Sequence, residues 1–179
     1  MLRALGVGLV SGPKEVRVGR CVSILMILFA VTAAAPAAAQ VAVTANPNHE
    51  QMLADPDARL AANKRLVYDF WREVFEAGHM DLADKYMAES YIQHNPNVAT
   101  GRAAFVEFFS KVTKPTPIQP SVKAPLVAIV ADGDFVVLSF VSRRKDPKDP
   151  SKSYTTTWFD MFRVEKGKIA EHWDPDTKE

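Results

Sequence analysis

Three ionisable side chains in two neighbouring segments near the C-terminus have the chemistry needed to move a proton. Asp160 lies in the first segment, residues 154–164, and His172 and Asp174 lie in the second, residues 168–174. A carboxylate beside an imidazole raises the pKa of the imidazole, and burial raises the pKa of a carboxylate. Groups tuned in this way suit general acid–base catalysis near neutral pH.

The two segments have the pattern of a β-hairpin. Each alternates in polarity, and Lys166-Gly167 breaks the alternation between them. The pattern predicts a three-residue connection, 165–167, closed by a left-handed glycine. In that register Asp160 faces His172, and Trp158 faces Asp174. Cross-strand partners share a face, so one face is expected to carry Trp158, Asp160, Phe162, His172 and Asp174. The other face carries Thr157, Phe159, Met161, Arg163, Ile169, Glu171 and Trp173.

Two interpretations of the first face remain open. In one, Trp158 and Phe162 form the apolar wall of a pocket in which the three ionisable groups act. In the other, Asp160 and His172 are a structural pair that holds the hairpin, and Asp174 is a frayed strand end. On the opposite face, Phe159 and Trp173 are expected to pack beneath a second subunit rather than to contact a ligand.

A second group of candidates lies upstream, in the short extended run Tyr91-Ile-Gln-His-Asn95 that ends at Pro96. His94 is expected to project toward the mouth of a cavity, where it contacts a substrate carbonyl group. The alternative is that His94 bonds to the backbone and fixes the strand end. Tyr91 is a weaker candidate, because tyrosine is often a packing residue with its hydroxyl group at an edge.

The sequence predicts neither a metal ion nor another cofactor. His94, Asp160, His172 and Asp174 are suitable ligand types, but none shows the helical i, i+4 spacing of metal-binding pairs. The single cysteine, Cys21, lies in the apolar N-terminal segment. Beyond that segment, disulfides, thiolate catalysis and cysteine–metal sites are therefore excluded.

Composition and charge describe an ordinary globular protein. The chain has 179 residues, of which 47% are hydrophobic and 24% charged, and this is enough for one core. The formal net charge is +1. Because residues 1–39 hold four basic side chains against Glu15, the rest of the chain is slightly acidic. Nucleic acid is therefore an unexpected partner.

The first 39 residues have the order of a cleavable signal peptide. A basic stretch, 14–20, precedes an apolar run, 21–35, and the small residues before Gln40 suit an Ala-x-Ala cleavage site. The alternative is an uncleaved membrane anchor, for which the apolar run is short. The protein is expected to be periplasmic or secreted, with contact to a membrane only through the leader. Residues 40–57 are expected to be a linker.

The remaining chain, 58–179, predicts one α+β domain. A helix opened by Asp55-Pro56 and stopped by Gly78, a short helix over 81–87 and a helix over 101–112 come first. Strands follow over 122–131, 135–144, 154–164 and 168–174. Helices followed by strands joined by turns are typical of an antiparallel sheet.

The motifs Tyr91-Ile-Gln-His-Asn-Pro96, Thr100-Gly-Arg102 and Gly167-Lys-Ile-Ala-Glu-His-Trp-Asp174 resemble those of the SnoaL-like polyketide cyclase branch of the NTF2-like superfamily. The resemblance covers about residues 58–175 and implies a cone in which helices pack in a curved antiparallel sheet around an apolar cavity. It also implies a homodimer through the outer sheet face. Ketosteroid isomerases of the same fold place an aspartate base just before a proline, where this chain has Asn95.

In related cyclases an acidic residue of the last strand acts as general acid and base in an aldol ring closure, and the motif places Asp174 there. The resemblance thus implies a metal-free cyclase or isomerase acting on a small carbonyl compound. Its expected catalytic residues are Asp174, His172 and His94, and its substrate-binding residues are Tyr91, Asn95, Trp158, Asp160 and Phe162. The alternatives are a non-catalytic module that binds an apolar small molecule and a dimeric scaffold with a collapsed cavity.

Overall fold

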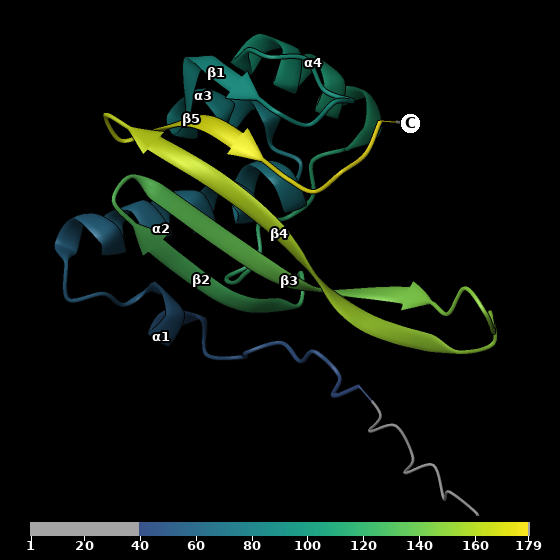
Figure 1. The fold of residues 1–179 in the computed structure, drawn as a ribbon. Coiled ribbons are helices and arrows are strands. Elements are labelled where there is room, and N and C mark those ends of the chain that lie inside the picture. Colours follow the sequence, from purple (N-terminus) through teal and green to yellow (C-terminus); the bar gives the residue numbers. More distant parts are fainter. Residues whose placement is uncertain (1–39, 179) are drawn as a thin grey trace, which may run out of the picture. The chain divides into compact units, whose positions relative to one another are not determined.

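Five strands form one curved sheet in the order β1-β5-β4-β3-β2, seen in the computed structural model of Figure 1. The structure describes residues 40–178. The strands are β1 (Met87–Gln93), β2 (Leu126–Asp132), β3 (Phe135–Lys145), β4 (Ser153–Glu165) and β5 (Lys168–Trp173). Strands β2 to β5 pair antiparallel, whereas β1 runs parallel to β5 at the far edge. The α+β class is confirmed, and the parallel edge strand is the one departure from an antiparallel sheet.

Among the described residues five helices precede the first strand, and a sixth, α4, lies between β1 and β2 in the chain. The helices are α1 (His49–Leu53), α2 (Ala58–Phe70), the π-helix η1 (Trp71–Glu76), the 3-10 helix η2 (Met80–Leu82), α3 (Ala83–Tyr86) and α4 (Arg102–Val112). Figure 1 shows α2 behind the sheet. Asp57, rather than Asp55, caps α2, because its side chain accepts hydrogen bonds from the backbone N–H groups of Arg59 and Leu60. The helical run ends before Gly78, whose φ of 74° suits glycine.

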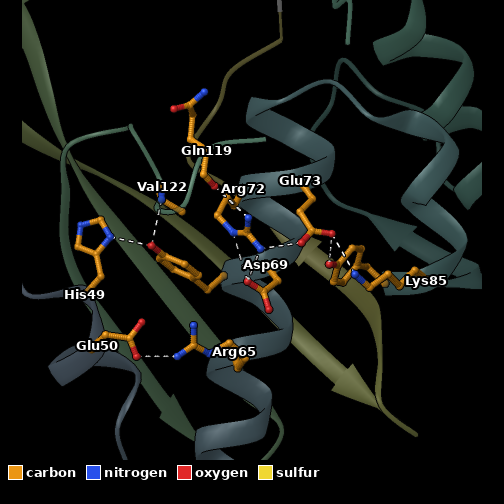
Figure 2. Close-up of polar contacts among 11 residues, drawn as sticks. His49, Glu50, Arg65, Asp69, Arg72, Glu73, Lys85, Gln119 and Val122 are labelled. Atoms are coloured by element: carbon orange, nitrogen blue, oxygen red, sulfur yellow. Dashed lines mark hydrogen bonds and ion pairs between the residues drawn. The ribbon is translucent and has the colours of Figure 1, made fainter. Parts of the chain in front are cut away.

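The π-helix η1 turns two aromatic side chains toward the sheet. The ring of Trp71 lies 4.5 Å from that of Phe75 and stacks at 4.6 Å on Phe140 of β3. The next residues, Arg72 and Glu73, enter a polar network instead, in which an Arg72 N–H group donates to Glu73 at 2.6 Å (Figure 2). Wider helical turns of this kind are frequent at functional sites.

The segment 40–57, expected to be a linker, is packed against the domain. It contains α1, whose Leu53 is 4% exposed. The His49 ring bonds to the Tyr68 hydroxyl group at 2.8 Å, and Arg65 donates to Glu50 at 2.9 Å (Figure 2). A short polar sequence lacks the periodicity that marks a helix, so these contacts with α2 were not visible in it. The leader expected over 1–39 lies outside the described residues.

The hairpin of β4 and β5 exists, but its register differs from the expected one. The difference is one residue beside the turn, where Val164 pairs with Ile169, and two residues farther along the strands, beyond a bulge. The turn has two residues, Lys166 and Gly167, with φ of 51° and 70°, the type I′ conformation that suits strand twist. Beyond the bulge Phe162 pairs with His172, and Asp160 lies diagonally across from His172. A shift of two residues preserves the alternation of faces, so the expected polar face survives.

A β-bulge at Ala170 corrects one assignment to the outer face. Val164 pairs with Ile169 and Arg163 with Glu171, so Ala170 is the extra residue. Alternation restarts there, and Ile169 points inward with 0% exposure. Glu171 and Trp173 keep the outward direction expected for them. Phe159, on the same outer face of β4, is 51% exposed.

The core lies between the helices and the inner face of the sheet. Val67 of α2, Val136 and Leu138 of β3 and Ile169 of β5 are all 0% exposed. No helix within residues 40–178 is long and apolar enough to cross a membrane. The core stops short of the sheet's end near β5 and α4, and a cavity opens there.

Candidate active site

A cavity of about 530 Å³ lies between α4, η1 and the inner face of the sheet. Ten aromatic side chains line it: Phe70, Trp71, Phe75, Tyr91, Phe105, Phe108, Phe109, Phe140, Trp158 and Phe162. Its size and apolar lining are typical of small-molecule sites. An open cavity contradicts the alternative of a scaffold whose interior is filled by side chains.

Polar residues from β1, β4 and β5 gather on one part of the cavity wall. They are Asp160, His172 and Asp174, which the hairpin pattern had placed on one face, together with Gln93 and Asn95. Tyr91, Trp158 and Phe162 also line the cavity. The structure therefore brings together seven of the eight side chains that the sequence had selected.

The hydrogen bonds of Gln93 determine which ring nitrogen of His172 carries a proton. Gln93 Oε1 accepts from the backbone N–H of Asn95 at 3.1 Å, so an amide oxygen occupies that position. The same oxygen lies 2.8 Å from His172 Nδ1. Because an amide oxygen only accepts, the network assigns a proton to Nδ1.

His172 Nε2 faces Asp160 Oδ1 at 3.0 Å, and one proton is shared between them. With Nδ1 protonated, the pair is either a neutral imidazole beside a carboxylic acid or an imidazolium beside a carboxylate. Both arrangements have zero net charge. The two groups consequently form a coupled pair that can hold or release one proton.

Asp160 is the most deeply enclosed member of this group, at 4% exposure. Burial raises the pKa of its carboxyl group, and the hydrogen bond and charge of His172 offset only part of that effect. Its second oxygen, Oδ2, is buried and has no hydrogen-bond partner among the described residues. A buried polar atom without a partner is uncommon and costs stability, which is typical of a functional site.

Asp174 is held beside the imidazole rather than bonded to it. Its Oδ2 lies 4.0 Å from His172 Nδ1 and accepts from the Asn95 side-chain amide at 2.9 Å. Its Oδ1 accepts from the backbone N–H of Asp176 at 2.9 Å. Asp174 and the Asp160–His172 pair thus lie side by side on the cavity wall. Asn95 binds Asp174, and Gln93 binds His172.

Tyr91 contributes a hydroxyl group to the same wall and is 2% exposed. Burial raises the pKa of this phenol well above its ordinary value, and the nearby charges of Asp174 and Asp160 raise it further. The hydroxyl group therefore stays protonated and can donate a hydrogen bond to a ligand oxygen.

His94 is the candidate that the structure moves away from the cavity. Its ring stacks on Trp173 at 4.7 Å, and Nε2 bonds to Glu171 Oε1 at 2.8 Å. Both partners lie on the outer face of β5. The expectation that His94 projects toward the cavity mouth is therefore wrong, because side chains alternate along β1 and His94 follows the inward-facing Gln93.

Gln93 is a site residue that the sequence analysis missed, although the signal was present. Alternation in 91–95 places Tyr91, Gln93 and Asn95 on one face and Ile92 and His94 on the other. The structure agrees, since Tyr91 is buried and Ile92 is 39% exposed. The two-residue alternation that was used for the hairpin therefore also selects Gln93 when it is applied to residues 91–95.

A metal ion is compatible with the distances but would compete with existing hydrogen bonds. Asp160, His172 and Asp174 each offer one ligand atom, and these atoms lie within 4.8 Å of one another. Both nitrogens of His172 already face oxygen atoms at hydrogen-bond distance. The expectation of metal-free chemistry stays a prediction.

Several solved structures are similar to this chain at low sequence identity. No curated protein matches the sequence. A proposed polyketide cyclase from Acidithiobacillus ferrooxidans is 21% identical, over 63% of this chain and 86% of that one, with a TM-score of 0.44. An NTF2-like protein of unknown function from Mesorhizobium loti is 21% identical, over 67% and 94%, with a TM-score of 0.45. An LEH-like epoxide hydrolase from M. tuberculosis is 14% identical, over 65% and 83%, also at 0.45.

These likenesses concern the fold and leave the reaction open. The family model for the SnoaL-like domain matches residues 67–172, which is more than half of the chain. The match includes β1, β4 and most of β5, the strands that carry the polar wall of the cavity. The chain belongs to the SnoaL-like family.

Proposed function

We propose that the protein is an exported enzyme that moves a proton on a small carbonyl compound, in an aldol-type ring closure or an isomerisation. One observation carries the proposal: an aromatic cavity holds a proton-sharing pair, Asp160–His172, with a second carboxylate, Asp174, 4.0 Å from the imidazole. Apolar surroundings strengthen the electrostatic interactions on which general acid–base catalysis depends.

In this proposal Asp174 takes a proton from the carbon beside the carbonyl group. The Asp160–His172 pair, which shares one proton, can return a proton to the product. Tyr91, whose hydroxyl group stays protonated, donates a hydrogen bond to the oxygen on which negative charge develops. Proton, electron pair and charge balance without another reactant, since the abstracted proton returns from the protein or from water.

The test measures exchange of the α-hydrogens of 2-tetralone for deuterium in deuterated buffer, followed by NMR. The wild-type protein should accelerate exchange, and Asp174→Asn should slow it by about 100-fold or more. Asp134→Asn, which removes the same charge from an exposed turn residue paired with Arg59, should leave exchange unchanged. Equal rates for wild type and Asp174→Asn would sink the assignment of Asp174.

A non-catalytic binding module is the second candidate. Both nitrogens of His172 and both carboxylate oxygens of Asp174 already have partners, an arrangement that also suits a fixed structural network. If ring ketones bind the cavity while the wild-type protein exchanges their hydrogens no faster than buffer, binding rather than catalysis is the function.

A further inference from the structure

The charged residues that line the cavity are all acidic. Asp160, Asp174 and Asp176 belong to the lining, and no lysine or arginine among residues 40–178 does. The rest of the wall is dominated by the ten aromatic rings. This combination gives the cavity a chemical preference beyond its general affinity for apolar compounds.

In the part of the chain that the structure describes, no lysine or arginine forms an ion pair with Asp174 or Asp176. Asp160 shares its proton with His172, so that pair contributes no net charge. Asp174 is held by the Asn95 amide and a backbone N–H group, and its one ion-pair contact among the described residues is the 4.0 Å approach to His172. Asp176, nearer the surface, accepts from the side-chain amides of Asn95 and Asn97. Amide donors orient a carboxylate without cancelling its charge.

Aromatic faces add to the attraction for a positive charge. Trp71 and Phe140 stack on one wall of the cavity, and Trp158 lies beside Asp160 on the sheet. The electron-rich faces of tryptophan, tyrosine and phenylalanine attract ammonium groups, most strongly where water is excluded. Carboxylates and aromatic rings thus favour the same kind of ligand.

We infer that the cavity selects an organic cation, specifically a ring-bearing amine, and rejects carboxylates and phosphates. The ring of the ligand lies among the aromatic side chains, and its ammonium group lies near Asp174. Anionic ligands are disfavoured because the described lining holds no lysine or arginine to pair with them, and His172 is already paired with Asp160. This selectivity goes beyond the proposed reaction and does not depend on it, since it concerns binding alone.

The experiment compares three non-reacting probes that share a ring and a short chain and differ in charge: 2-phenylethylamine, 2-phenylethanol and phenylacetate. Calorimetry on the purified protein at neutral pH gives each Kd. The amine should bind at least about tenfold more tightly than the alcohol, and phenylacetate should show no saturable binding. No turnover is measured in this experiment, so a failure of the amine to bind leaves the proposed reaction standing. Equally, a failure of the deuterium-exchange test leaves the inference about binding standing.

Two variants with the same charge change locate the effect. Asp174→Asn should weaken amine binding by about tenfold and change alcohol binding by less than about twofold. Asp134→Asn should alter neither, because Asp134 lies on an exposed turn and pairs with Arg59 at 2.7 Å. Thermal melting checks that both variants are folded. The inference is overturned if the alcohol or phenylacetate binds as tightly as the amine, if the amine does not bind, or if the two variants behave alike.

Discussion

Replacing Gln93 by leucine tests the assigned proton position in the site most directly. The substitution removes the oxygen that accepts from His172 Nδ1 and from the Asn95 backbone N–H. Leucine is of similar size, so the change is mainly the loss of an acceptor. Gln93→Glu is the matched variant, because a carboxylate keeps the acceptor at the same place.

The expected loss of stability follows from burial. His172 is 7% exposed, and its next nearest acceptor for Nδ1 is Asp174 Oδ2, at 4.0 Å. A buried donor left without an acceptor costs about 1–3 kcal/mol. Gln93→Leu should therefore lower the free energy of unfolding by about 1–3 kcal/mol. Gln119→Leu, which changes an exposed glutamine bonded only to a nearby carbonyl through its side chain, should change it by less than about 0.5 kcal/mol.

The decisive measurement is the tautomer of His172, read from NMR spectra of protein labelled with 15N-histidine. Wild type and Gln93→Glu should show a proton bonded to Nδ1. In Gln93→Leu the Nδ1 proton has no acceptor, so the pair gains by releasing it and keeping the shared proton on Nε2, where the Asp160 carboxylate accepts it. Stability alone does not distinguish a lost acceptor from poor packing, whereas the tautomer does. An unprotonated Nδ1 in neutral wild-type His172, or the same tautomer in wild type and Gln93→Leu, would refute the reasoning.

Four further predictions concern the fold, its pH dependence, assembly and export. Gly78→Ala should cost about 1–3 kcal/mol more than Gly133→Ala by denaturant unfolding, because both have positive φ but only at Gly78 would a Cβ lie 2.8 Å from a backbone oxygen. Burial raises the pKa of Glu73, but hydrogen bonds from neighbouring side chains outweigh it and lower the pKa overall. The ionised Glu73 side chain stabilises the fold at pH values above the pKa that it has in the unfolded chain, and this stabilisation is lost as the pH falls through its lower pKa in the folded protein. Glu73→Gln should therefore reduce the loss of stability between about pH 5 and pH 3. If the protein dimerises through the outer sheet face, Phe159→Glu should give monomers by sedimentation without changing the circular dichroism spectrum. Mass spectrometry of the exported protein should find a chain that begins at Gln40, and an intact leader would contradict cleavage.

Much of the site followed from the two-residue period of β-strands. That period placed Trp158, Asp160, Phe162, His172 and Asp174 on one face, and it did so although the predicted turn was one residue too long. The shorter turn shifts the register by one residue, and the bulge at Ala170 shifts it by one more. Beyond the bulge the register error is therefore two residues, a whole period, and the faces are unchanged. Between the turn and the bulge at Ala170 the register error is one residue. Ile169 therefore points inward, whereas the outer face was predicted for it.

The sequence by itself determined the class of fold, the hairpin and the shared face of its ionisable side chains, because these depend on local alternation and on residue types. Only the tertiary structure showed that β1 inserts in parallel beside β5. That long-range pairing brings Gln93 to His172 across 79 residues of chain, and no local spacing encodes it. The same pairing turns His94 to the outer face and leaves an aromatic cavity whose charged lining is acidic, since the sum of side chains around a cavity exists only once the chain has folded.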